Sequence, residues 1–146
     1  MIATVRPDSW NLPLFLHILG ATVLFGGVAT VVVLSLAARR IPMQAPLAHR
    51  LALTTLLAVV WPAYVLMYAG ALWIASREDL HPSFPTWMVF GVSVADAGVV
   101  VLLVLTLLAW LARRRARAGA FAAGLSAVYL VALGVAWWAM TTKPGA

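Results

Sequence analysis

The sequence contains no cysteine and few charged residues. Without a thiol, the chain has no disulfide framework, no thiolate metal ligand and no cysteine nucleophile. Charged residues make up only 10% of the 146 residues, against about 25% in an ordinary soluble domain. Hydrophobic residues reach 64% instead, and a chain this short has too much surface to bury them all in water. The excess apolar surface must therefore face lipid.

Sequence motifs of soluble enzymes are also missing. The glycine pair Gly26 and Gly27 is followed by no phosphate-loop lysine, and there is no G-x-S-x-G nucleophile turn. The four acidic residues are not paired for acid–base chemistry. We therefore expect no catalytic residue and a protein that is not an enzyme.

Four apolar runs are long enough to cross a bilayer: residues 12–38, 51–75, 87–112 and 118–140. Each exceeds the roughly 20 residues that a helix needs to cross about 30 Å of hydrocarbon. Lipid offers no hydrogen-bond partner to backbone groups, so each run must be helical. The short connections favour antiparallel neighbours. The sequence predicts an all-α, integral membrane, up-down four-helix bundle that forms a single transmembrane domain over residues 1–146.

Basic residues indicate the orientation of this bundle. Seven of the ten Lys and Arg residues lie in the first and third connections, which contain no acidic residue. The positive-inside rule predicts that these connections face the cytoplasm and that both termini lie on the outer, periplasmic or extracellular, side of the plasma membrane. The seven residues are Arg39, Arg40, Arg50, Arg113, Arg114, Arg115 and Arg117. The N-terminal segment, the second connection and the tail hold Arg6, Asp8, Arg77, Glu78, Asp79 and Lys143.

Tryptophans gather at the opposite ends of the predicted helices. An aromatic belt at the membrane surface accounts for this placement. The five residues are Trp10, Trp73, Trp87, Trp137 and Trp138. The basic residues are not interleaved with aromatics on one helix face, so we predict no nucleic-acid partner. Arg113, Arg114, Arg115 and Arg117 are candidates for binding anionic lipid headgroups.

Polar side chains inside the spans define a candidate site. His17 shares one helical face with Gly20 and Gly27, whose small size lets another helix approach, so His17 is expected to point into the bundle. Asp96 is costly in hydrocarbon unless it is protonated, paired or hydrated. At similar predicted depths the spans place a polar layer of His17, Tyr64, Tyr68, Ser93 and Asp96.

Three interpretations of this layer remain open. It could be a structural hydrogen-bond network, with His17 bonded to a carbonyl or to Asp96. It could bind haem or copper through His17, with Met67, Met88 and Met140 as further candidate ligands. It could also form part of a proton or small-solute pathway in an oligomer.

Two further features suggest local structure. Pro62 removes a backbone amide in the second helix and leaves the carbonyl of Ala58 unpaired, which predicts a kink. His49 and His81 fall at predicted connections, where we expect solvated turn residues.

Several short segments, spread in order over nearly the whole chain, carry a resemblance to a known family: LHILGA at 16–21, FGG at 25–27, WPA at 61–63 before Gly70, Trp87, and WAMTTKP at 138–144. With these segments the chain resembles the bacterial integral membrane proteins of domain of unknown function 2269. The first segment also resembles the wider group of copper-resistance membrane proteins and four-helix protoporphyrinogen oxidases. That resemblance implies haem or copper binding and maps only His17 onto the family histidine. The nearer family implies a bacterial plasma membrane and has no established activity that could be carried over.

Taken together, the sequence favours an accessory or assembly component of the membrane that is not an enzyme. Its expected partners are the lipid bilayer and either other membrane subunits or further copies of the chain.

Overall fold

The computed structural model describes residues 11–76 and 86–142, and these are almost entirely helical. The first helix, α1, spans Asn11–Arg40. A short turn of 3-10 helix, Pro42–Gln44, leads into α2 (Ala45–Thr55), a π-helical segment (Leu56–Val60) and α3 (Trp61–Ala75), which run on as one continuous rod. After the undescribed segment come α4 (Thr86–Ala112) and α5 (Ala116–Thr142).

The predicted fold class is confirmed. Within the described residues, four helical rods are each long and apolar enough to cross a membrane. The chain is therefore an all-α, four-helix, multi-pass membrane protein. The predicted and observed helix ends differ most at the second span. The sequence predicts a start at residue 51, and the span begins at Pro42. Arg50 consequently lies on a helix and not in a turn.

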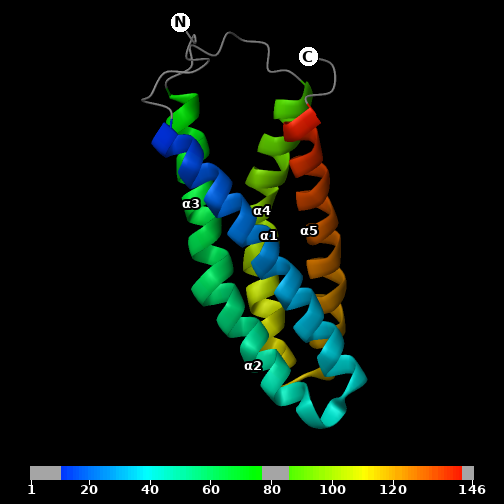
Figure 1. The fold of residues 1–146 in the computed structure, drawn as a ribbon. Helices are drawn as coiled ribbons and strands as arrows, with labels where there is room; N and C mark the ends of the chain where they lie inside the picture. Colours follow the sequence, from blue (N-terminus) through cyan, green and yellow to red (C-terminus); the bar gives the residue numbers. More distant parts are fainter. Residues whose placement is uncertain (1–10, 77–85, 143–146) are drawn as a thin grey trace, which may run out of the picture.

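The helices form two pairs that meet along part of their length. α1 packs along α2 and α3, and α4 packs along α5. The two pairs touch where α1 contacts α5 and where α2 contacts α4. Figure 1 shows α3 and α4 diverging toward the end of the bundle at which α1 begins and α5 ends. We call this the tryptophan end, since Trp73, Trp137 and Trp138 lie there, and the opposite end the arginine end.

Burial follows the expectation for a bundle in lipid. A narrow core of aliphatic side chains runs through the centre, and its fully buried members include Leu24, Leu56, Leu102 and Leu105. Large apolar side chains cover the outside as well. Since such a surface is stable only in hydrocarbon, it is the lipid-facing surface of the protein.

Pro62 is accommodated by a local change of helix type. The five residues before Trp61 form a π-helix, in which the Trp61 amide donates to the carbonyl of Leu56. The wider turn places an extra residue where the proline ring would otherwise meet the preceding carbonyls. At the place where the sequence predicts a kink, the rod contains a π-helical segment.

Some predictions fall on residues outside the described ranges. They concern Arg6, Asp8, Trp10, Arg77, Glu78, Asp79, His81 and Lys143.

Candidate functional site

The contact between α1 and α3 depends on two glycines. A Cβ atom on Gly20 would lie 2.8 Å from the carbonyl oxygen of Ala63, and one on Gly70 would lie 2.7 Å from the backbone nitrogen of His17. Both distances are too short for any larger residue, so the two backbones meet directly. The expectation that His17 lies on a glycine-bearing face packed against a neighbouring helix is confirmed.

His17 uses this close approach to bond across the helix pair. Its Nδ1 lies 2.9 Å from the backbone carbonyl oxygen of Met67. Because a carbonyl only accepts, Nδ1 carries the proton and donates it. In the neutral imidazole this leaves Nε2 as a lone-pair acceptor, which is the form of histidine that ligates metals.

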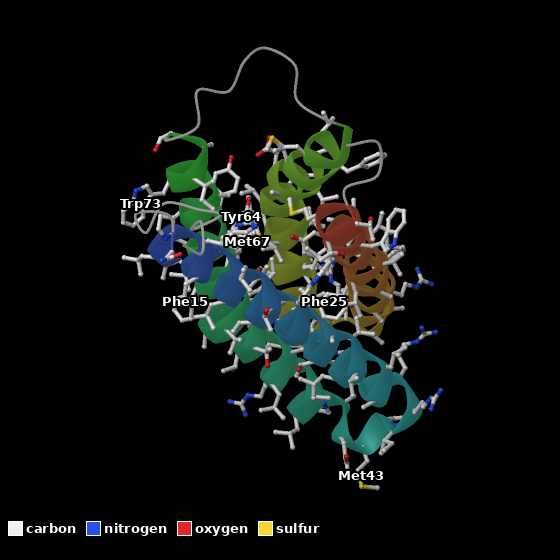
Figure 2. The ribbon with its side chains drawn as sticks, turned by 45° about the horizontal axis from the view of Figure 1, so that its top comes forward. Phe15, Phe25, Met43, Tyr64, Met67 and Trp73 are labelled. Carbon is white, nitrogen blue, oxygen red and sulfur yellow. The ribbon has the colours of Figure 1, made fainter. Side chains whose placement is uncertain are left out.

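Two tyrosines of α3 bridge the diverging helices α3 and α4. The Tyr64 hydroxyl donates to the carbonyl of Ala95 at 2.7 Å, and the Tyr68 hydroxyl donates to Oδ1 of Asp96 at 2.8 Å. Tyr64 and Tyr68 are one turn apart and their rings stack with centroids 5.8 Å apart. Figure 2 shows Tyr64 and Met67 toward the middle of the bundle, whereas Phe15 and Trp73 lie on its outside.

Asp96 lies on the open side of this bridge. It is about 15 Å along α4 from Thr86, in the half of the helix nearer the tryptophan end. Its side chain is exposed, and so are those of Ser93 one turn away and of the apolar residues Val92, Val100 and Leu103. Asp96 is thus a carboxyl group on a lipid-facing surface.

The predicted polar layer is divided between two helix contacts. His17 lies at the contact of α1 with α3 and bonds to Met67, while Asp96 lies between α3 and α4 and bonds to Tyr68. The partner of the His17 ring is therefore a backbone carbonyl and not Asp96 or a tyrosine. Since Met67 and Tyr68 are consecutive residues of α3, one helix turn supports both sites from two different faces.

Two polar features between the helices lie outside the polar layer expected from the sequence. The Trp61 indole donates to Thr106 at 3.0 Å, which ties α3 to α4. The Tyr129 side chain is 4% exposed and its hydroxyl has no hydrogen-bond partner among the described residues. That hydroxyl would lie 2.5 Å from a Cβ on Gly98, so the glycine makes room for it. The sequence signals that could have identified these groups were two isolated polar residues in apolar runs, Thr106 and Tyr129.

The prediction that His49 is a solvated turn residue is wrong. The side chain is only 9% exposed, because α2 begins at Ala45 and carries His49 into the bundle. Its ring packs on α5, where Cε1 lies 2.7 Å from the Cβ position of Gly119. The absent side chain of Gly119 provides the space.

The arginines of the third connection remain exposed at the arginine end. The Arg114 guanidinium lies over the Trp110 ring, 5.8 Å from its centroid, as in a cation–π contact. Trp110, Arg113 and Arg114 line a small surface cavity of about 150 Å³.

The candidate metal ligands belong to different helix pairs. Met67 is buried at the α1–α3 contact, whereas the Met140 side chain lies over Gly91 between α4 and α5. The described residues contain no group of three His, Cys, Asp or Glu side chains placed to hold a metal ion. A metal at His17 would therefore need ligands of another kind.

Comparison of the chain with protein-family models, with curated proteins and with solved structures finds no match.

Proposed function

We propose that this chain is an accessory subunit of a membrane assembly, is not an enzyme, and docks a helix of another membrane protein against the exposed face of α4 around Asp96. The observation that carries the proposal is the Tyr68–Asp96 pair on a lipid-facing surface. Membrane-exposed carboxyl groups of this kind are rare outside protein contacts.

The free energy of the exposed carboxyl group favours a partner. Placing Asp at the centre of a membrane helix costs about 2.5–3.5 kcal/mol even on the mildest scales. Within the described residues, the Tyr68 hydroxyl donates to one oxygen of Asp96 and the other oxygen has no donor. A partner helix with a hydroxyl, amide or cationic donor at the same depth would satisfy the other and offset this cost, since donors between membrane helices stabilise their association.

The proposed location is the bacterial plasma membrane, with the arginine end in the cytoplasm and both termini outside. The positive-inside rule and the exposed tryptophans of the opposite end support this orientation. We also propose membership of the domain of unknown function 2269 family, supported by the sequence segments described above.

Photocrosslinking from the α4 face tests the docking proposal. A photoreactive residue at Ser93, beside Asp96, should give one discrete adduct with another protein in native membranes. The matched control is Thr22, an exposed hydroxyl residue on α1, which should give lipid adducts only. Lipid adducts alone at Ser93 would refute docking, and an adduct of twice the mass of the chain would refute a different partner in favour of self-association.

Substitution of Asp96 separates a hydrogen-bonding role from a proton-carrying one. Asp96→Asn keeps both the shape and the ability to accept from Tyr68, so the Ser93 adduct should persist. Asp96→Leu should abolish it. A loss as complete in Asn as in Leu would instead indicate that the ionisable group itself is needed, either to pair with a cationic partner or in a proton pathway.

A second candidate function is haem or copper binding through His17. The favouring observation is the bond to Met67, which fixes the orientation of the ring and makes Nε2 the nitrogen that the neutral imidazole would offer to a metal. Elemental analysis and an optical spectrum of the purified protein test this. A Soret band or bound copper that disappears in His17→Ala would support the candidate, and the same spectrum in both proteins would exclude it.

A further inference from the structure

A second surface feature lies on the other edge of α4, where it meets α5. Apolar side chains line an open surface groove of about 510 Å³ there. Its floor is formed by small residues of α5: Gly124 has no atom within 4 Å of its Cβ position, and Ala120 is one turn away. The groove is lined by Val104, Leu108, Ala120, Phe121, Gly124, Leu125 and Val128.

An arginine stands at one end of this groove. On α5, Arg117 precedes Ala120, Phe121 and Gly124 at spacings of three, four and seven, so it shares their helical face. Helical side chains lean toward the N-terminus of their helix, and α5 begins at the arginine end. The exposed Arg117 therefore reaches away from the apolar groove toward the membrane surface.

The groove, measured from Arg117, is as long as one leaflet of a bilayer is thick. From Arg117 to Val128 the helix rises about 17 Å at about 1.5 Å per residue. Half of a hydrocarbon core of about 30 Å is about 15 Å. The groove thus begins at the level of the headgroups and ends near the bilayer midplane.

We propose that this groove binds an anionic phospholipid, with one acyl chain lying along Ala120, Gly124 and Val128 and the phosphate held by Arg117. The neighbouring Arg115 and the positive end of the α5 dipole, which begins at Ala116, add attraction for the same phosphate. This inference does not depend on the docking proposed for the opposite edge of α4.

Charge favours a lipid over a second copy of the chain. Small residues such as Ala120 and Gly124 could also admit a helix. A symmetric dimer formed through this groove would, however, bring the arginines of the two copies together at one end. The described part of the chain supplies no acidic side chain at that end to offset them, since Asp96 is its sole carboxylate side chain. A phosphate supplies the opposite charge.

Native mass spectrometry of delipidated protein tests the proposal. The probes are phosphatidylglycerol and phosphatidylcholine with the same acyl chains. Gly124→Leu fills the groove, and its matched control is Gly26→Leu on α1, because Gly26 is also exposed with open space at its Cβ. Arg117→Gln removes the charge, and its matched control is Arg40→Gln at the same end.

The wild type should retain phosphatidylglycerol in preference to phosphatidylcholine. Arg117→Gln should weaken the binding of phosphatidylglycerol about fivefold, equivalent to about 1 kcal/mol. It should weaken the binding of phosphatidylcholine less, because the choline cation offsets the charge of its phosphate. Gly124→Leu should reduce retention of both lipids, and the two controls should match the wild type. The proposal would be overturned if Gly124→Leu and Gly26→Leu retained equal amounts of lipid. A wild-type dimer converted to a monomer by Gly124→Leu would overturn it in favour of a second copy.

Discussion

At the scale of single residues, the glycines of this chain fall into two kinds. At Gly20 and Gly70 the backbone of one helix fills the place of a side chain on the other. At Gly26 and Gly124 the same place is empty. The two kinds are equivalent in the sequence, so their different contributions to stability follow from packing alone.

Alanine substitution should separate these two kinds. Gly20→Ala should lower the free energy of unfolding by about 1–3 kcal/mol, because the methyl group would push α1 and α3 apart. Gly26→Ala should raise it by up to about 1 kcal/mol, because alanine favours the helix and meets nothing. Thermal unfolding in detergent measures both. Equal effects at the two positions would show that α1 and α3 do not meet at Gly20.

The buried Tyr129 hydroxyl gives a second prediction at the residue scale. An unpaired hydroxyl in the core costs free energy, so Tyr129→Phe should stabilise the protein by up to about 1 kcal/mol. Tyr64→Phe is the matched control; it loses the bond to Ala95 and should destabilise by about 0.5–1.5 kcal/mol. If Tyr129→Phe is as damaging as Tyr64→Phe, the hydroxyl has a partner, such as a buried water.

At the scale of elements, the second span is a rod with one irregular turn. The π-helical segment Leu56–Val60 faces α1, where Val60 Cγ2 lies 2.8 Å from the Cβ position of Gly27. Two features could stabilise the π-helical turn: the missing amide of Pro62 and the packing of Val60 against Gly27.

Hydrogen exchange in detergent distinguishes these causes. Pro62→Ala restores the amide, so the turn can return to α-helical bonding. The amides of Leu56–Val60 should then exchange at least threefold more slowly than in the wild type. Amides of α5 serve as the internal reference. Unchanged exchange would assign the π-helical turn to packing against Gly27.

At the scale of the whole molecule, the two ends of the bundle predict its orientation in the membrane. The arginine end carries Arg39, Arg40 and the third connection. Met43 is 93% exposed and lies at the same end (Figure 2). A reporter that works only in the cytoplasm should be active near Met43 or after Arg117 and silent at either terminus. Activity at the C-terminus would reverse the proposed orientation.

Charge removal checks the cause of that orientation. Neutralising Arg113, Arg114, Arg115 and Arg117 together should mix the two orientations, because the positive-inside rule predicts that these charges keep the third connection in the cytoplasm. Neutralising Arg77 alone should leave a single orientation. A stronger effect from Arg77 would contradict the positive-inside argument.

The sequence by itself determined the class of the protein. The apolar runs are long enough to cross a bilayer, and lipid offers no hydrogen-bond partners, so the four spans must be helices. Their number and approximate ends therefore follow from hydropathy alone. The glycine face of α1 was also predictable, since a period of 3.6 residues places His17 and Gly20 together.

Only the tertiary structure decided which polar groups meet. Similar depth suggested one layer, but depth does not specify the rotation of a helix about its axis. Rotation turns His17 to α3 and Asp96 to the open side of α4. His49 shows the same limit, because its burial depends on a glycine 70 positions away, Gly119 on α5. Such contacts depend on packing between distant segments, which local sequence patterns do not record.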